Sequence, residues 1–232
     1  MLKQSKSFSI LGDSISTLFG YSQPSEAVFY TAAKRYETGV YSLSDTWWGQ
    51  VIDTLGGRLL VNNSFSGSTV CFDPRNEIAS YGCSDARTSA LGIDGEVPDV
   101  ILIFMGMNDH GLGVPLHPTC EAEKNDLTVF SEAYAEMLRK LRANVPPAEL
   151  WCLTLPLGSL DGYAPSEAAR QRTEAYSNVI AECAVQNACH LIDICQMEPY
   201  ESFDGLHPNA KGMRQIADAV LTAWEKGEIC DF

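Results

Sequence analysis

The residues best suited to chemistry begin with a serine at the end of a short apolar run, Ser7-Phe8-Ser9-Ile10-Leu11-Gly12-Asp13-Ser14. The run predicts a β-strand that leads through Gly12 into the start of a helix. Such a turn would leave Ser14 at the carboxyl edge of an α/β sheet, where free backbone N–H groups bind anionic groups. Ser14 could therefore be a nucleophile. Serine is also a favoured helix cap, so this stretch alone leaves an ordinary turn serine as the alternative.

A second segment places a carboxylate three residues before an imidazole: Asp204-Gly205-Leu206-His207-Pro208-Asn209. In a turn, this spacing lets Asp204 hold one ring nitrogen of His207 and leaves the other nitrogen able to take a proton from Ser14. Nucleophile, base and orienting acid are the roles of a catalytic triad, which is recognised by roles rather than by sequence order.

Acyl transfer also needs hydrogen-bond donors at the oxygen that becomes negative in the transition state. Two other apolar segments end in polar residues, one in Ser66-Gly67-Ser68 and one in Met107-Asn108-Asp109-His110. The main-chain N–H groups of Ser14 and Gly67 and the side-chain amide of Asn108 could supply three donors. Glycine suits this position because its missing side chain lets a substrate approach the backbone closely.

The elements that must position these residues alternate between strands and helices. After the strand that ends near Gly12, we expect strands over 59–63, 99–106, 150–155 and 190–194. We expect helices over about 45–57, 127–143, 166–187 and 210–224, and a short one within 79–92. The run at 99–106 is continuously apolar, as in parallel strands covered on both faces. The chain therefore predicts one α/β domain, residues 1–232, with helices on both faces of a parallel sheet.

Residues 17–44 carry six aromatic side chains and many turn formers without a sustained period, which predicts a long loop over the sheet edge. This loop could wall a pocket, or its aromatic residues could only pin it to the body of the protein. Residues 111–125 also read as irregular. In the helix at 45–57, Trp47 and Trp48 are interpreted as core anchors rather than as a ligand platform.

Four blocks of this sequence resemble, in order, those of the SGNH, or GDSL-type, hydrolases: Gly12-Asp13-Ser14, Ser66-Gly67-Ser68, Gly106-Met107-Asn108-Asp109 and Asp204-Gly205-Leu206-His207-Pro208. They extend over nearly the whole chain. The resemblance implies a flavodoxin-like three-layer α/β/α sandwich with a parallel sheet of about five strands. It implies that Ser14 is the nucleophile, that His207 is the base oriented by Asp204, and that Ser14, Gly67 and Asn108 form the oxyanion hole. It implies no metal and no cofactor.

Members of that family are esterases, lipases, thioesterases and carbohydrate deacetylases. We expect a serine esterase that cleaves an O-acyl ester through an acyl-enzyme, with a small-molecule or carbohydrate ester as its substrate. A short-chain esterase or a carbohydrate O-deacetylase fits this expectation best. A lysophospholipase or thioesterase is the alternative within enzymes, and a catalytically inactive binding module of the same fold is the alternative from another class.

The charge of the chain limits its partners, because 30 acidic residues against 16 basic ones give a formal net charge of −14. Such a chain would repel nucleic acids and anionic membrane surfaces. No apolar signal region precedes the first strand, and no segment approaches the length of a membrane span. We therefore expect a cytoplasmic protein that binds no nucleic acid and has no stable membrane association.

The eight cysteines lie singly, without a Cys-x-x-Cys pair, at positions 71, 83, 120, 152, 183, 189, 195 and 230. We expect reduced structural thiols, with Cys152 and Cys195 in strands and Cys183 in a helix. Of the other histidines, His190 is interpreted as structural and His117 as a loop residue. His110 could line the pocket without a catalytic role. Asp13 is expected to fix the turn around Ser14 rather than to act as an acid.

Overall fold

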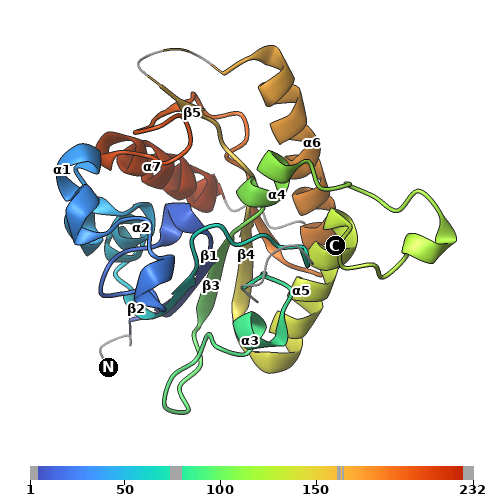
Figure 1. Ribbon diagram of the computed structural model, residues 1–232. Coiled ribbons are helices and arrows are strands. Elements are labelled where there is room, and N and C mark those ends of the chain that lie inside the picture. The colour runs from blue at the N-terminus through green and yellow to red at the C-terminus, as the bar shows by residue number, and fades with distance from the viewer. Residues whose placement is uncertain (1–4, 74–79, 161–162, 164, 227–232) are drawn as a thin grey trace.

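A parallel sheet of five strands forms the centre of the computed structural model, which describes residues 5–73, 80–160, 163 and 165–226 (Figure 1). The spatial order is β2-β1-β3-β4-β6, and the strands are β1 (Ser7–Gly12), β2 (Arg58–Ser64), β3 (Val100–Phe104), β4 (Glu149–Leu153) and β6 (His190–Ile192). This is the flavodoxin-like order, in which the chain reverses its direction across the sheet between β1 and β3. Ligands of such sheets bind outside the carboxyl ends of the strands at this reversal.

Helices cover both faces of the sheet, which confirms the expected three-layer α/β/α sandwich. Helices α2 (Trp47–Thr54) and α7 (Ala210–Lys226) pack together on one face. Helices α5 (Phe130–Asn144) and α6 (Glu167–Gln186) pack together on the other, and the short helix α3 (Asp85–Thr88) lies against α5. Strands β1 and β3 are buried along their whole length because they lie in the middle of the sheet with helices on both sides.

Aromatic side chains join the sheet to the layer of α2 and α7. The Trp224 ring of α7 stacks on the Trp151 ring of β4 with 3.8 Å between centroids, and Phe8 of β1 lies 6.3 Å from Trp224. Trp47 of α2 packs edge-on against Phe104 of β3. Burying a large apolar side chain of this kind contributes roughly 1.5–3 kcal/mol, so these contacts fix the helix layer on the sheet.

The long helices begin and end where the sequence predicts, with one exception. Thr46 and Ser166 cap α2 and α6, because their hydroxyl oxygens accept the N–H groups of Gly49 at 3.0 Å and Ala169 at 3.2 Å. Helix α5 begins at Phe130 instead of Leu127. Residues 127–129 form a turn outside the helix, and the Leu127 carbonyl accepts the N–H group of Phe72 at 2.9 Å.

Two expectations about local structure were wrong, and one small sheet was not expected. Residues that follow β3 form a helix, α4 (Met107–Leu112), where an irregular segment was expected from residue 111. A small second sheet pairs β5 (Gly158–Ser159) with β7 (Tyr200–Glu201). Cys195 lies beyond β6 rather than in a strand, because that strand ends at Ile192.

The long loop at 17–44 contains the short helices η2 (Ser25–Ala27), η3 (Ala32–Lys34), α1 (Arg35–Thr38) and η4 (Leu43–Asp45), and η5 (Glu121–Glu123) lies in the irregular 113–129 segment.

All seven cysteines within the described ranges are free thiols, and Cys230 lies outside those ranges. Five of them are buried, at 71, 83, 152, 183 and 189. Burial raises the pKa of Cys83 and that of Cys183 to about 12, which keeps both as unreactive thiols at neutral pH. None of the helices in the described ranges is long and apolar enough to cross a bilayer.

Candidate active site

Ser14 lies two residues after the end of β1, at the start of the short helix η1 (Ser14–Ser16), and only 4% of its surface is exposed. The Asp13 carboxylate caps this helix by accepting the N–H group of Ile15 at 3.0 Å, so Asp13 fixes the turn as expected. Gly12 is required by space, because a Cβ atom there would lie 2.6 Å from Ser16 Cβ and 2.8 Å from Ser64 Oγ. The turn can therefore bring Ser14 to the sheet edge only with glycine before it.

Two tryptophans hold the other end of this turn. The indole N–H of Trp47 donates to Ser16 Oγ at 3.2 Å, and that of Trp48 donates to the Ser16 carbonyl at 3.0 Å. The same carbonyl accepts the side-chain amide of Asn62 in β2 at 2.9 Å. Both tryptophans are fully buried, which confirms them as core anchors and shows that they also fix the backbone beside Ser14.

The turn before α7 brings the predicted acid and base to Ser14. His207 Nε2 lies 3.0 Å from Ser14 Oγ across 193 positions of sequence, and His207 Nδ1 lies 2.7 Å from Asp204 Oδ2. The second carboxylate oxygen, Asp204 Oδ1, accepts the N–H groups of Leu206 at 3.1 Å and His207 at 2.8 Å. One carboxylate therefore closes the turn and holds the imidazole ring.

The other two predicted residues lie in the segments that follow β2 and β3, Gly67 in a loop and Asn108 in helix α4. Gly67 has a φ of +79°, a conformation that favours glycine, and a Cβ atom there would point into open space. Asn108 is the second residue of α4, and one hydrogen of its amide is donated to the carbonyl oxygen of Ser68 at 2.9 Å. The structure thus links Asn108 to the Gly67 loop and leaves the second amide hydrogen for a ligand.

Phe29, from the loop at 17–44, stacks on the His207 ring, with 3.4 Å between centroids and an angle of 11° between planes. Lys34 Nζ lies 3.4 Å from the Phe29 centroid, and the hydroxyl of Tyr30 donates to the Pro208 carbonyl at 2.8 Å. The aromatic residues therefore pin the loop to the body, and the loop also forms one wall around His207. The sequence shows that these aromatics exist, but no pattern in it indicates the partner of Phe29 or of Lys34.

The electrostatic surroundings favour a neutral base and an ionised orienting acid. Burial is the largest influence on His207 and lowers its pKa, the charge of Lys34 lowers it further, and Asp204 opposes both. Partial burial alone would raise the pKa of Asp204, but the hydrogen bonds from the backbone and ring of His207 lower it overall. A neutral imidazole beside an ionised carboxylate can accept a proton from a hydroxyl group.

Two buried carboxylic acids support the loops of the site. Burial raises the pKa of Asp13 to about 7 and that of Asp109 to about 6. Asp109, in α4, accepts the N–H groups of Val70 at 2.8 Å and Cys71 at 3.0 Å. This pair of bonds ties the loop after Gly67 to the helix that carries Asn108.

An apolar pocket of about 370 Å³ lies beside the turn that carries Asp204 and His207, and its walls include Met107, His110, Leu157, Leu160, Tyr200 and Leu206. His110 therefore lines a pocket, and its Nε2 lies 3.2 Å from Thr173 Oγ1 rather than beside a carboxylate. His190 stacks on Trp151, in keeping with a structural role. Within the described ranges, no group of three or more His, Cys, Asp or Glu residues could hold a metal ion.

Comparisons with known proteins identify the family. The model of the GDSL-like lipase/acylhydrolase family matches residues 6–224. A solved structure of a candidate GDSL-like lipase from Bacteroides ovatus is 30% identical, with a TM-score of 0.74 over 97% of this chain and 100% of that one.

Two more distant structures share the fold. They are an aryl esterase from M. smegmatis (17% identity, TM-score 0.65, 96% of this chain and 100% of that one) and the carbohydrate acetylesterase Est24 from Sinorhizobium meliloti (16% identity, TM-score 0.60, 96% and 98%). A search of curated proteins finds no match. The family match covers most of the chain and agrees with the sheet order, so the chain belongs to the GDSL-like lipase/acylhydrolase family.

Proposed function

We propose that this protein is a serine esterase that hydrolyses O-acyl esters through an acyl-enzyme on Ser14. One observation carries the proposal: Ser14 Oγ, the His207 ring and the Asp204 carboxylate form a continuous hydrogen-bonded chain with contacts of 3.0 and 2.7 Å. Both distances lie within the reach expected of nucleophile to base and of base to orienting acid. Membership in a family of lipases and acylhydrolases supports the same reaction class.

In this mechanism, Ser14 Oγ attacks the carbonyl carbon of the ester while His207 Nε2 takes the hydroxyl proton. Asp204 stabilises the imidazolium through Nδ1. The negative oxygen of the tetrahedral intermediate accepts the N–H groups of Ser14 and Gly67 and the second amide hydrogen of Asn108. His207 then gives its proton to the leaving alcohol, and the acyl group stays on Ser14. Water, activated by the same imidazole, releases the acid and restores the serine.

A short-chain ester, such as an acetyl group on a carbohydrate or another polar alcohol, is our first substrate class. The formal charge of −14 opposes binding to anionic lipid surfaces. The fold is shared with an enzyme described as a carbohydrate acetylesterase and one described as an aryl esterase. One observation favours a second candidate, a lysophospholipase or thioesterase: the apolar pocket of about 370 Å³ beside the His207 turn has room for a longer acyl group.

The test is hydrolysis of p-nitrophenyl esters from acetate to palmitate, together with labelling by an organophosphonate and mapping of the labelled residue by mass spectrometry. We expect turnover of the acetate, rates that fall with chain length, and a label on Ser14. Ser14→Ala should fold with an unchanged Tm and lose turnover. Rates that rise towards palmitate would favour the second candidate. A protein that hydrolyses no ester would be a binding module, and a label on another serine would refute the assignment of Ser14.

A further inference from the structure

Arg87, in the short helix α3, is 5% exposed and lies beneath the loops of the site. Its guanidinium group donates to the carbonyl oxygens of Gly12 and Asn63, each at 2.8 Å, to Ser68 Oγ at 2.7 Å, and to the carbonyl of Ser80. All four acceptors are neutral oxygens: three lie at the end of β1, at the end of β2 and in the loop around Gly67, and the fourth, the Ser80 carbonyl, lies in the segment before α3. One side chain therefore joins the three segments that converge below Ser14.

The side chain stays charged in this position. Burial lowers the pKa of Arg87 to about 10, and the carboxyl group of Asp13 opposes that shift, so the group is a cation at neutral pH. Burying a cation is costly unless hydrogen bonds replace its water shell. The planar guanidinium can satisfy several acceptors at fixed angles, which an ammonium group cannot do.

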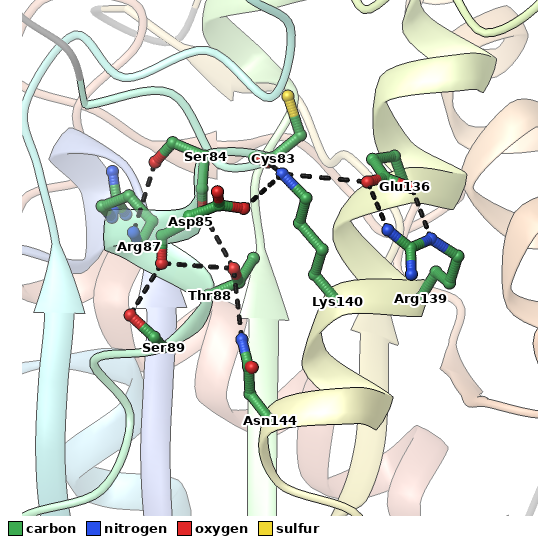
Figure 2. A network of polar contacts seen from close by, with 10 residues as sticks. All are labelled: Cys83, Ser84, Asp85, Arg87, Thr88, Ser89, Glu136, Arg139, Lys140 and Asn144. Atoms are coloured by element: carbon green, nitrogen blue, oxygen red, sulfur yellow. Dashed lines mark hydrogen bonds and ion pairs between the residues drawn. The ribbon is translucent and has the colours of Figure 1, made fainter.

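Helix α3 is too short to be stable alone, so its neighbours must hold Arg87 in place. Figure 2 shows how this is done: the Ser84 hydroxyl accepts the Arg87 N–H at 3.2 Å, and Lys140 of α5 reaches across to α3. Lys140 Nζ donates to the Cys83 carbonyl at 2.8 Å and pairs with the Asp85 carboxylate at 2.7 Å. These two contacts of Lys140 join α3 and the residue before it to helix α5.

Each candidate oxyanion donor lies close to a contact of Arg87. Gly12 precedes Ser14 by two residues, and Gly67 directly precedes Ser68. Ser68 receives the guanidinium on its hydroxyl and the Asn108 amide on its carbonyl, so a chain of hydrogen bonds runs from Arg87 through Ser68 to Asn108. A displacement of Arg87 would therefore move the donors supplied by the two loops as well as the backbone before the nucleophile.

We propose that Arg87 is a positioning residue that holds the oxyanion-hole segments from their buried side. The proposal rests on the proposed esterase function. Donors act on a transition state most strongly when their positions are fixed before the reaction, in a site that excludes water.

The test compares Arg87→Lys and Arg87→Met with the wild type by p-nitrophenyl acetate hydrolysis, with kcat expressed per site titrated by an organophosphonate. Loss of one direct oxyanion donor lowers kcat by about 10²–10³ in other hydrolases, so an indirect support should lower it about 10-fold in Arg87→Lys and up to about 100-fold in Arg87→Met. KM should change less than threefold, because the ground-state carbonyl uses these donors little.

Arg142→Met is the matched control, since Arg142 of α5 donates to the carbonyl oxygens of Ala148 and Ala188, which precede β4 and β6 at the edge of the sheet away from Ser14. It should lower the Tm and leave kcat per titrated site within twofold of the wild type. If Arg87→Met does not fold, Ser68→Ala tests the same link. It should lower kcat at least threefold, and the Arg87→Lys/Ser68→Ala double variant should lose less than the product of the single losses.

The results separate the two proposals. A wild type without Ser14-dependent turnover would overturn both. Arg87 variants that keep wild-type kcat per titrated site would overturn only the role of Arg87. The same holds if Arg142→Met, at an equal loss of Tm, lowers kcat as much as the Arg87 variants do, because general loosening would then explain the effect.

Discussion

Asp204→Asn separates the two tasks of the Asp204 carboxylate. Asp204 Oδ1 accepts two backbone N–H groups, from Leu206 and His207, while Oδ2 faces His207 Nδ1 at 2.7 Å. An asparagine has one oxygen and one NH₂ group, and two N–H donors would repel its NH₂ group. The oxygen must therefore stay on the backbone side, and the NH₂ group must face His207 Nδ1.

This arrangement forces the wrong tautomer on the base. With a donor at Nδ1, the neutral ring carries its proton on Nε2, which faces Ser14 and can no longer accept a proton. The same change at the triad of a serine protease lowers kcat by about 10⁴. The Asp204 side chain is 38% exposed, so water can partly replace it. We therefore expect a loss of about 10²–10³ in kcat, or about 2.7–4.1 kcal/mol in the barrier.

The assay is kcat at saturating p-nitrophenyl acetate, with thermal unfolding measured on the same samples. Asp204→Asn should keep its Tm within a few degrees because the acceptor for the turn remains. Asp204→Ala is the companion variant, and it should lose both kcat and Tm because it also removes that acceptor. An Asp204→Asn enzyme with kcat within threefold of the wild type would refute the argument from tautomers.

Four further outcomes are expected. Asn108→Ala should lower kcat by about 10²–10³ with little change in KM, because its amide binds the oxyanion more strongly than the ground-state carbonyl; an effect confined to KM would contradict this. The acid limb of the pH profile of kcat/KM should have a midpoint below 6.5, since burial lowers the pKa of His207 and only the neutral ring accepts a proton. Lys34→Gln should move that midpoint upward because the charge of Lys34 also lowers this pKa, and a downward shift would contradict the assigned charge effect. Burial raises the pKa of Asp13 to about 7 from the usual 3.8, so its protonated form stabilises the folded state at low pH, and this stabilisation is lost as the pH rises towards 7. Asp13→Asn should therefore have a free energy of unfolding up to about 4 kcal/mol above that of the wild type at pH 8 and little changed at pH 4, as measured by urea titration. Dithiothreitol should leave the Tm unchanged if the cysteines are reduced, and a fall of several degrees would show that disulfides stabilise the fold.

The sequence predicted the sheet and its helices well because those signals are local. Continuous apolar runs such as Val100–Phe104 can be buried on both faces only in the middle of a covered parallel sheet. The contact between Asp204 and His207 could likewise be predicted from local sequence, since a carboxylate three residues before an imidazole can reach it within one turn. The start of α5 escaped prediction, because the Phe72 N–H that binds the Leu127 carbonyl comes from a distant segment. Helix α4 escaped prediction for a similar reason, since Asp109 holds it to the distant backbone of Val70 and Cys71.

The tertiary structure alone decided what surrounds the triad. In the sequence, Arg87 is one charged residue in a polar stretch, the usual pattern of a solvated surface. Three acceptors from distant segments, together with the nearby Ser80 carbonyl, are what allow it to be buried. Phe29 and Lys34 acquire their relation to His207 only when residues 17–44 fold over the turn before α7. Hydrogen bonding and burial at these positions depend on groups far apart in the chain, so no local spacing could have indicated them.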